Sequence, residues 1–232
     1  SEMCIRDSIN PDEKRILFLI EGKNFDETSG AILKNLFSSR SKTYIVPVTE
    51  TLLAILRPLK QEESFEDMRH IAEIIVDTLN TEALIHVRLS YSSVMNTLSD
   101  ISDAFRETSL ALKVGRLFYS EQNIFPYNEL GIGRLIYRLP ASLCENFLSE
   151  IFGTSTPEAL DPELTATINR FFLNNLNIAE TARQLHMHRN TLIYRLEQVE
   201  KQTGLDLRTF EDAMTFKVAM MVINYLKGNQ EL

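Results

Sequence analysis

A short stretch near the carboxyl end of the chain concentrates side chains that can recognise nucleic acid. Arg189, Asn190 and Thr191 are consecutive, and Tyr194 and Arg195 follow about one helical turn later. Arginine pairs bidentately with guanine edges and asparagine with adenine edges, while threonine and tyrosine reach phosphates or the thymine methyl group. The types and spacing of these residues predict contact with double-stranded DNA.

Two helices joined by a tight corner would position these side chains, between residues 177 and 204. Asn177 stands where an N-cap is expected, and Gly204 supplies a stop. Two sets of residues between them recur at helical spacing: Ile178, Thr181, Ala182 and Leu185, then Leu192, Leu196 and Val199. A short helix, a corner of three or four residues and a longer helix with a polar start is the plan of a helix-turn-helix.

The second helix, about residues 189–203, would be the recognition helix in the major groove. His186 is expected as a packing residue of the corner, and His188 as a phosphate contact or as the N-terminal cap of the second helix. The free N–H groups at the start of that helix also suit a phosphate. From the pattern alone, an ordinary helical hairpin with a polar exposed face is the alternative.

A longer run of sequence around the corner carries a family resemblance. AETARQL followed by HMHRNTLIYRLEQVEKQTGLDLRTFED resembles the C-terminal helix-turn-helix of the carbohydrate diacid regulator and purine catabolism regulator family, and more distantly the Fis-type helix-turn-helix. The resemblance runs from about Leu176 to Tyr225. It implies one-component regulation of catabolic genes, and it supports one set of DNA-contacting residues: His188, Arg189, Asn190, Thr191, Tyr194 and Arg195.

Composition limits the class of protein. The chain has 232 residues, of which 44% are hydrophobic and 24% charged, which allows one large or two small domains with ordinary cores. No apolar run approaches the ~18 residues of a membrane span, and the polar start is unlike a secretory signal. Cys4 and Cys144 are isolated and are expected as reduced thiols. These features predict a cytoplasmic protein without membrane contact.

The charge is unevenly distributed. The net charge is −8, with eight Lys and Arg against nine Asp and Glu in residues 161–232, and sixteen against twenty-three in residues 1–160. Residues 183–195 hold three arginines and no acid. So narrow a basic region predicts weak non-specific binding by one copy. Useful affinity is therefore expected to depend on dimerisation or on a lost partner domain. A homodimer is the arrangement we expect, with half-sites about 34–36 Å apart.

Strand and helix signals alternate in the first half of the chain. Strand character marks residues 14–20, 43–48, 51–56 and 83–89, and helical spacing marks residues 26–38, 64–79 and 98–117. Only Thr49 and Glu50 separate the two middle strands, and Ser64 and Asp67 stand in the positions of a capping box. The order β-α-β-β-α-β predicts an α+β, ferredoxin-like domain with two helices on one face of an antiparallel sheet, followed by an all-α helix-turn-helix domain.

This region resembles the degenerate GGDEF-like domain that precedes the helix-turn-helix in the same family. Ser-Tyr-Ser-Ser at residues 90–93 and the helical FRETSLALKVGR carry the resemblance. The turn where a working diguanylate cyclase has its glycines and paired carboxylates is Pro47-Val48-Thr49-Glu50-Thr51, with one carboxylate and no glycine. Since paired carboxylates help to hold Mg²⁺, a non-catalytic regulatory or dimerisation role is expected, with a retained small-molecule pocket as the alternative.

Other catalytic signatures fail on inspection. Gly131-Ile132-Gly133 is a lone Gly-x-Gly, and the sequence has neither a P-loop nor a nucleophile elbow. His186 and His188 are two apart and have no cysteine pair beside them, which argues against zinc. We therefore expect no enzyme activity, no cofactor and no metal.

These observations predict a disordered start at residues 1–13, a GGDEF-like domain at 14–127, a helical linker at 128–160 and a helix-turn-helix domain at 161–232. Thr209 and Asp212 would cap a last helix at 210–226, whose wide apolar surface predicts burial or a partner. The resemblance implies a sensor segment ahead of Lys14 that binds a small-molecule effector, so the chain is expected to be a fragment or a short member. The alternatives are a ligand-sensing module or a protein-interaction module using Met221, each with a vestigial helix-turn-helix.

Overall fold

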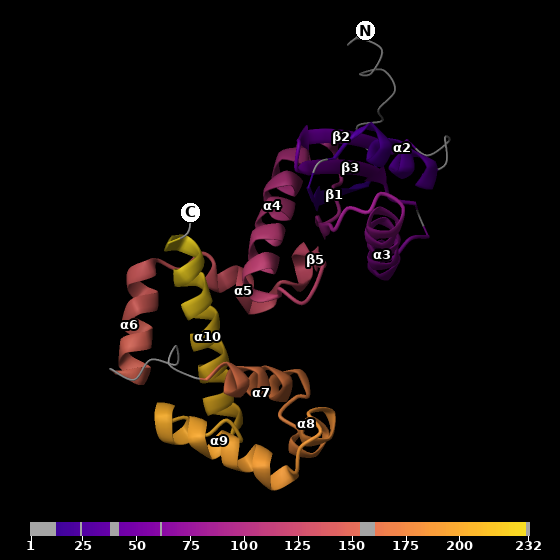
Figure 1. Cartoon of the computed structure of the whole chain (residues 1–232). Coiled ribbons are helices and arrows are strands. Elements are labelled where there is room, and N and C mark those ends of the chain that lie inside the picture. The colour runs from indigo at the N-terminus through magenta and orange to yellow at the C-terminus, as the bar shows by residue number, and fades with distance from the viewer. Residues whose placement is uncertain (1–12, 24, 38–41, 61, 154–160, 231–232) are drawn as a thin grey trace. The chain divides into compact units, whose positions relative to one another are not determined.

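The computed structural model describes residues 13–23, 25–37, 42–60, 62–153 and 161–230 (Figure 1). For residues 229 and 230 it describes the backbone but not the side chains. Apart from Glu13, the expected disordered start lies outside these ranges, as does Cys4. The chain divides into two compact units, Ser1–Leu135 and Ile136–Leu232, and each is described by itself. Within the described ranges, no helix is both long and apolar enough to cross a membrane.

A five-stranded sheet forms the centre of the first unit. The strands β1 (Arg15–Glu21), β2 (Tyr44–Thr49), β3 (Leu52–Pro58), β4 (Arg88–Tyr91) and β5 (Ile124–Pro126) lie in the order β2-β3-β1-β4-β5. The neighbouring pairs are antiparallel except β4 and β5, which are parallel. The first six residues of the central strand β1 are buried, and after Arg15 this buried stretch is a run of five apolar residues, 16–20.

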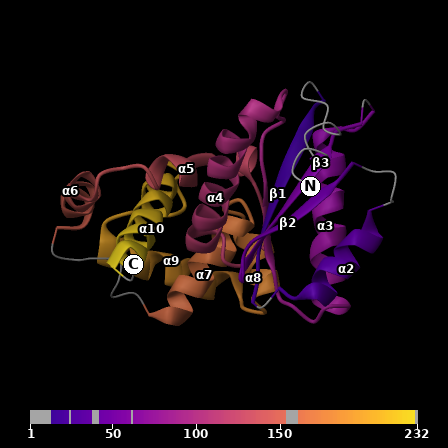
Figure 2. The ribbon, with the colours of Figure 1, turned by 90° about the horizontal axis from the view of Figure 1, so that it is seen from above.

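Helices cover both faces of this sheet. α2 (Glu27–Leu36) and α3 (Phe65–Thr81) lie on one face, and α4 (Ile101–Phe118) lies on the other (Figure 2). Phe18 and Tyr91 belong to the apolar core on the side of α2 and α3. Ser90 faces the opposite way, and its Oγ donates to the carbonyl of Thr108 in α4 at 2.9 Å. Two short 3-10 helices, η1 (Leu98–Asp100) and η2 (Tyr127–Glu129), precede α4 and follow β5.

Two details of the first unit correct the expectation from the sequence. The sequence does not predict β5, because its three residues fall in a segment whose proline looks like a break; this strand makes the sheet mixed rather than antiparallel. The strand expected at residues 83–89 begins only at Arg88. Leu84 has a φ of 55° and is 84% exposed, so the chain turns there before it enters the sheet.

The described part of the second unit is helical. It comprises α6 (Ala141–Phe152), α7 (Pro162–Leu173), α8 (Ile178–Gln184), α9 (Arg189–Thr203) and α10 (Phe210–Gln230), while α5 (Gly131–Ile136) ends at the boundary between the units. α6 packs along α10, and the Tyr225 hydroxyl donates to the carbonyl of Leu139 at 3.0 Å. Phe216 and Ala219 of α10 belong to the apolar core of this unit, so part of the wide apolar surface of the helix is buried there. Met221 of the same helix is 8% exposed.

Candidate nucleic-acid interface

The corner between α8 and α9 is built from local signals. The side chain of Asn177 caps α8 by accepting from Glu180 N at 3.0 Å. Four residues then connect the helices, and His186 takes a positive φ of 51° so that the chain can reverse direction. The His188 side chain caps α9, because its Nδ1 accepts from Asn190 N at 3.2 Å. The sequence anticipates both caps.

An apolar stripe fixes the orientation of α9. Leu192, Leu196 and Val199 are at most 1% exposed and pack in one core with Ala182 of α8 and Phe171 of α7. α9 ends at Gly204, which has a φ of 76° in the left-handed region that favours glycine. Because one side of α9 is held in the core, its opposite side faces solvent.

Five of the six predicted contact residues are exposed together at the start of α9. His188, Arg189, Asn190 and Thr191 are exposed, and the side chain of Tyr194 is 57% exposed. Asn190 and Tyr194 lie one turn apart, on the side away from the apolar stripe. The N–H groups of Asn190 and Thr191 already donate to His188, so an incoming phosphate would meet side chains rather than these two groups.

Arg195, the sixth predicted residue, is held inside the unit. Its side chain is 23% exposed, and its Nη1 donates to Thr167 Oγ1 at 2.8 Å. It also forms an ion pair with Glu163. Both partners belong to α7, so Arg195 fixes α9 to α7 and does not join the exposed group. The sequence gives no signal for this pairing, because Glu163 and Thr167 lie about thirty residues earlier.

The three arginines between residues 183 and 195 differ in their surroundings. Arg183 donates to Glu180 at 2.6 and 2.9 Å, and these bonds lower the pKa of the Glu180 carboxyl. Arg195 is paired with Glu163. Among the described residues, no carboxylate lies within ion-pair distance of Arg189. Of the three guanidinium groups, that of Arg189 is therefore the most available to an anion.

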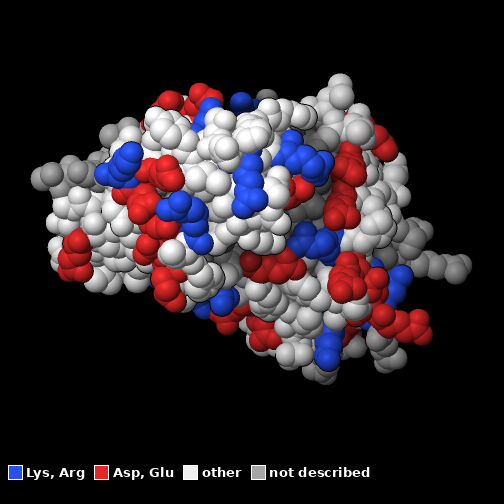
Figure 3. Space-filling view, turned by 90° about the horizontal axis from the view of Figure 1, so that it is seen from below, with Lys and Arg blue, Asp and Glu red and all other residues white. Residues whose placement is uncertain are grey.

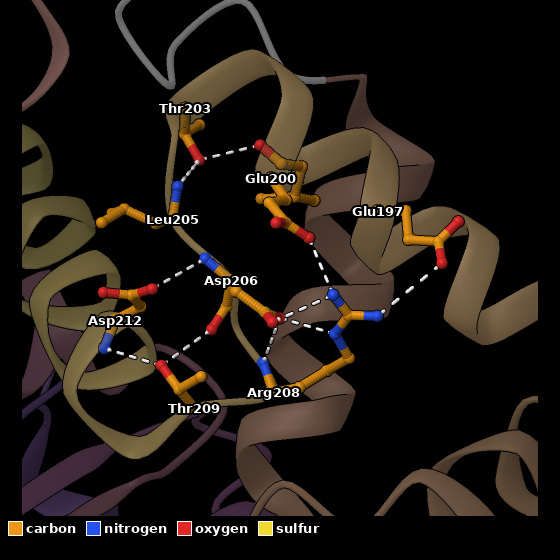
Figure 4. Close-up of polar contacts among 9 residues, drawn as sticks. Glu197, Glu200, Thr203, Leu205, Asp206, Arg208, Thr209 and Asp212 are labelled. Atoms are coloured by element: carbon orange, nitrogen blue, oxygen red, sulfur yellow. Dashed lines mark hydrogen bonds and ion pairs between the residues drawn. The ribbon is translucent and has the colours of Figure 1, made fainter.

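A polar cluster ties the end of α9 to the start of α10 (Figure 4). Arg208 donates from Nε to Asp206 Oδ1 at 2.6 Å and from Nη2 to Glu200 Oε2 at 2.8 Å, and its Nη1 lies 3.7 Å from Glu197. The bond from Arg208 lowers the pKa of the Asp206 carboxyl. Arg208 thus offsets part of the negative charge on the second half of α9.

The expected capping box before α10 is only half formed. Asp212 N donates to Thr209 Oγ1 at 3.4 Å, as expected. The Asp212 carboxylate does not return to Thr209 but accepts from Asp206 N at 3.0 Å (Figure 4). The backbone N–H of Thr209 donates instead to the carbonyl of Asp206 at 2.9 Å.

The charged surface agrees with a narrow basic region. On the face shown in Figure 3, lysine and arginine are scattered among aspartate and glutamate, with no continuous basic patch. Among the described residues, no group of three or more His, Cys, Asp or Glu side chains is arranged to hold a metal. Cys144 is buried, and burial raises the pKa of its thiol.

The carboxyl-terminal part of the chain is similar to a known family of domains. Residues 164–222 match the family described as the PucR C-terminal helix-turn-helix domain. The purine catabolism regulatory protein of Bacillus subtilis is 33% identical over 135 residues, which cover 58% of this chain and 25% of that protein. The carbohydrate diacid regulator of Escherichia coli is 24% identical over 196 residues, covering 82% of this chain and 50% of that protein.

A third relative aligns over more of the chain. The DNA-binding transcriptional activator AdeR of Bacillus subtilis is 23% identical over 218 residues, which cover 88% of this chain and 50% of that protein. The chain spans half or less of the length of these three relatives. The matched residues 164–222 include all of α8 and α9. The resemblance to the carbohydrate diacid and purine catabolism regulators is thus confirmed, and it includes residues 164–222, which match the PucR C-terminal helix-turn-helix domain.

Proposed function

We propose that this chain regulates transcription by binding DNA, with the first two turns of α9 in the major groove. The observation that carries the proposal is the exposed group at the start of α9, which a buried stripe on the same helix holds in a fixed orientation. In this role Arg189 and Asn190 contact base edges, and Thr191 and Tyr194 contact bases or nearby phosphates. His188 fixes the start of the helix as its cap.

Arg195 has a different role in this proposal. Its guanidinium is committed to Glu163 and Thr167, so it positions α9 instead of reading bases. The remaining contact surface of one copy is small and carries little positive charge. We therefore propose a homodimer that places two α9 helices in successive major grooves, about 34–36 Å apart.

We also infer the setting from the relatives. The purine catabolism regulatory protein of Bacillus subtilis is named for a catabolic process, and PutR of the same organism for its response to proline. We propose catabolic genes as the targets of this chain. Such a regulator works where the DNA is, in the bacterial cytoplasm. A small-molecule effector would act through a sensor segment outside the described residues.

The first unit is proposed as a non-catalytic, ferredoxin-like domain of the degenerate GGDEF-like kind. The strand order β2-β3-β1-β4 and the exposed β2–β3 turn without glycine support this reading. The alternative role, a protein-interaction module that uses the last helix, is not supported by the exposure of that helix. In that alternative Met221 would contact the partner protein, but this residue is buried.

The proposal is tested by selecting bound duplexes from a random pool with the intact chain at low salt. Arg189→Ala is compared with Lys201→Ala, which removes a positive charge from the exposed far end of the same helix. We expect enrichment of a palindrome by the wild type and by Lys201→Ala, and a palindrome that lacks the preference at one position of each half-site with Arg189→Ala. If no sequence is enriched by the wild type, the proposed function is wrong for this chain.

A further inference from the structure

The strand β2 forms one edge of the sheet in the first unit and pairs with β3 on one side only (Figure 1). Its last four residues are exposed, and the exposed fractions of Val46 and Val48 are 51% and 42%. The strand carries no charged residue. Pro47 and the irregular register that follows it limit strand pairing, but both lie in the second half of β2. The first half is therefore open to another strand.

The pairing within the sheet shows which backbone groups of β2 are free. Gly22 N donates to the carbonyl of Thr51 just beyond one end of the β1–β3 pair. Since bonded residues alternate along an antiparallel strand, the odd-numbered residues of β3 bond to β1, and the even-numbered ones, such as Ala54, bond to β2. Val46 lies opposite Ala54, so its N–H and C=O are used within the sheet. The N–H and C=O of Ile45, one residue earlier, therefore point outward.

The side chain of Val46 points to the face of the sheet on which α4 lies. Residues opposite each other on neighbouring strands share a face. Ala54 lies opposite both Val46 and Leu19, and Leu19 lies opposite Ser90. Ser90 donates to α4. Because Val46 is nevertheless 51% exposed, α4 leaves this side of β2 uncovered. Tyr44, two residues before Val46, shares the same face.

We propose that β2 pairs antiparallel with β2 of a second copy of this chain, about a twofold axis between the two Ile45 residues. In this register the two Ile45 residues exchange both of their hydrogen bonds, and the Thr43 N–H of each copy donates to the Pro47 carbonyl of the other. The N–H that Pro47 lacks would have bonded to the Thr43 carbonyl, so the proline removes no other bond. Each Val46 packs against Tyr44 of the other copy.

The edge of β2 is complementary to itself in this register. With the axis at Val46 instead, Ile45 would lie opposite Pro47, and both Ile45 carbonyls would be left without a donor. Lys42 precedes the uncharged strand and Glu50 follows it, and both are exposed. An antiparallel pair brings Lys42 of one copy toward Glu50 of the other, whereas a parallel pair would bring like charges together. Hydrogen bonds and charge therefore both favour a second copy in the antiparallel direction.

This inference rests on the homodimer of the proposed function, for which it supplies a contact in the first unit. The two can fail separately. A monomeric chain that still enriches a DNA sequence would refute the pairing of β2 and leave DNA binding in place. A dimer held through β2 that enriches no sequence would refute DNA binding and leave the pairing in place.

The first test is sedimentation equilibrium of the full chain over a range of concentrations. We expect a reversible equilibrium between monomer and dimer. Val46→Lys should weaken self-association by about tenfold or more, because it replaces an apolar contact by a charge at the strand edge. Val94→Lys is the same change at a valine that is 41% exposed and lies outside β2, and it should leave self-association unchanged. A wild type that stays monomeric up to millimolar concentration, or equal association in the two variants, would overturn the proposal.

Cysteine variants test the register. In the proposed pair Tyr44 lies opposite Val46 of the other copy, with Cα atoms about 4.5 Å apart, which suits a disulfide. Each of these residues is only a diagonal neighbour of its own counterpart, at about 7–8 Å, which is too far for one. With Cys4→Ser in every chain, a mixture of Tyr44→Cys and Val46→Cys chains should form disulfide-linked dimers under mild oxidation, and neither chain alone should. No linked dimer in the mixture, or equal linking by one variant alone, would overturn the register about Ile45.

Discussion

His188 decides how α9 begins. Its ring nitrogen accepts from Asn190 N, so replacing it with alanine leaves that N–H without a cap. We expect His188→Ala to lower the free energy of unfolding by about 0.5–2 kcal/mol, measured by urea denaturation. His188→Asn should keep most of the stability, because asparagine is a good N-cap. Equal losses in the two variants would show that capping is not what His188 contributes.

Arg189 and Arg195 are predicted to differ although both are arginines of α9. Arg195→Met removes the contacts to Glu163 and Thr167 but keeps the apolar stem. It should weaken binding to the selected duplex and to a scrambled duplex by the same factor, because α9 is then held less firmly against α7. Arg189→Ala should instead weaken binding to the selected duplex more than binding to the scrambled duplex. A change in sequence preference with Arg195→Met, measured by competition between duplexes, would mean that Arg195 reaches the bases.

At the scale of elements, the cluster around Arg208 makes the junction of α9 and α10 sensitive to acid. The folded state lowers the pKa of Asp206. A carboxyl whose pKa is lower in the folded than in the unfolded chain contributes stability above its unfolded pKa, about 3.9, and this stability is lost as the pH falls through the folded pKa. Glu63 and Glu180 also have lowered pKa values and add to the same loss.

We therefore expect Asp206→Asn to flatten, but not abolish, the fall in unfolding free energy below about pH 4. Urea midpoints measured from neutral pH downwards would show this. The variant should be less stable than the wild type at pH 7, and the two curves should converge in acid. Curves that stay parallel down to the lowest pH would show that the bond to Arg208 adds nothing to stability.

Helix boundaries could be predicted from the sequence because their signals are local. Asp26 and Ser64 cap α2 and α3 as capping boxes, Asn177 caps α8 and Gly204 ends α9, and each signal lies within four residues of its effect. β5 could not be predicted, since three residues become a strand only when β4 lies beside them. The strand start at Arg88 was missed for a related reason, because the turn at Leu84 uses a conformation that leucine rarely adopts.

The candidate DNA-contacting residues were predictable as residue types but not as individual environments. Four of them share the first turn of α9 or its cap, and local spacing is enough to place them together. Arg195 looked equivalent to Arg189 in the sequence. Its partners on α7 are near it only after α7 and α9 have packed, so the pairing depends on tertiary structure.

At the scale of the whole molecule, the net negative charge limits which part of the surface can bind DNA. The net charge is −8, and the second half of α9 carries Glu197 and Glu200 beside Arg208. Phosphates would therefore be tolerated near the start of α9 and repelled near its end. This asymmetry supports binding by the first turns of the helix.

The central claim is that the first turns of α9 read the bases of DNA. The most direct test compares binding to a series of duplexes, each with one base pair of the selected site changed. For the wild type, each change at a contacted position should cost about 1–3 kcal/mol. With Arg189→Ala, the preference at one position of each half-site should disappear while the others remain, and Lys201→Ala should keep them all. If Arg189→Ala instead weakens every duplex equally and keeps every preference, the start of α9 does not read bases through Arg189, and the central claim is contradicted.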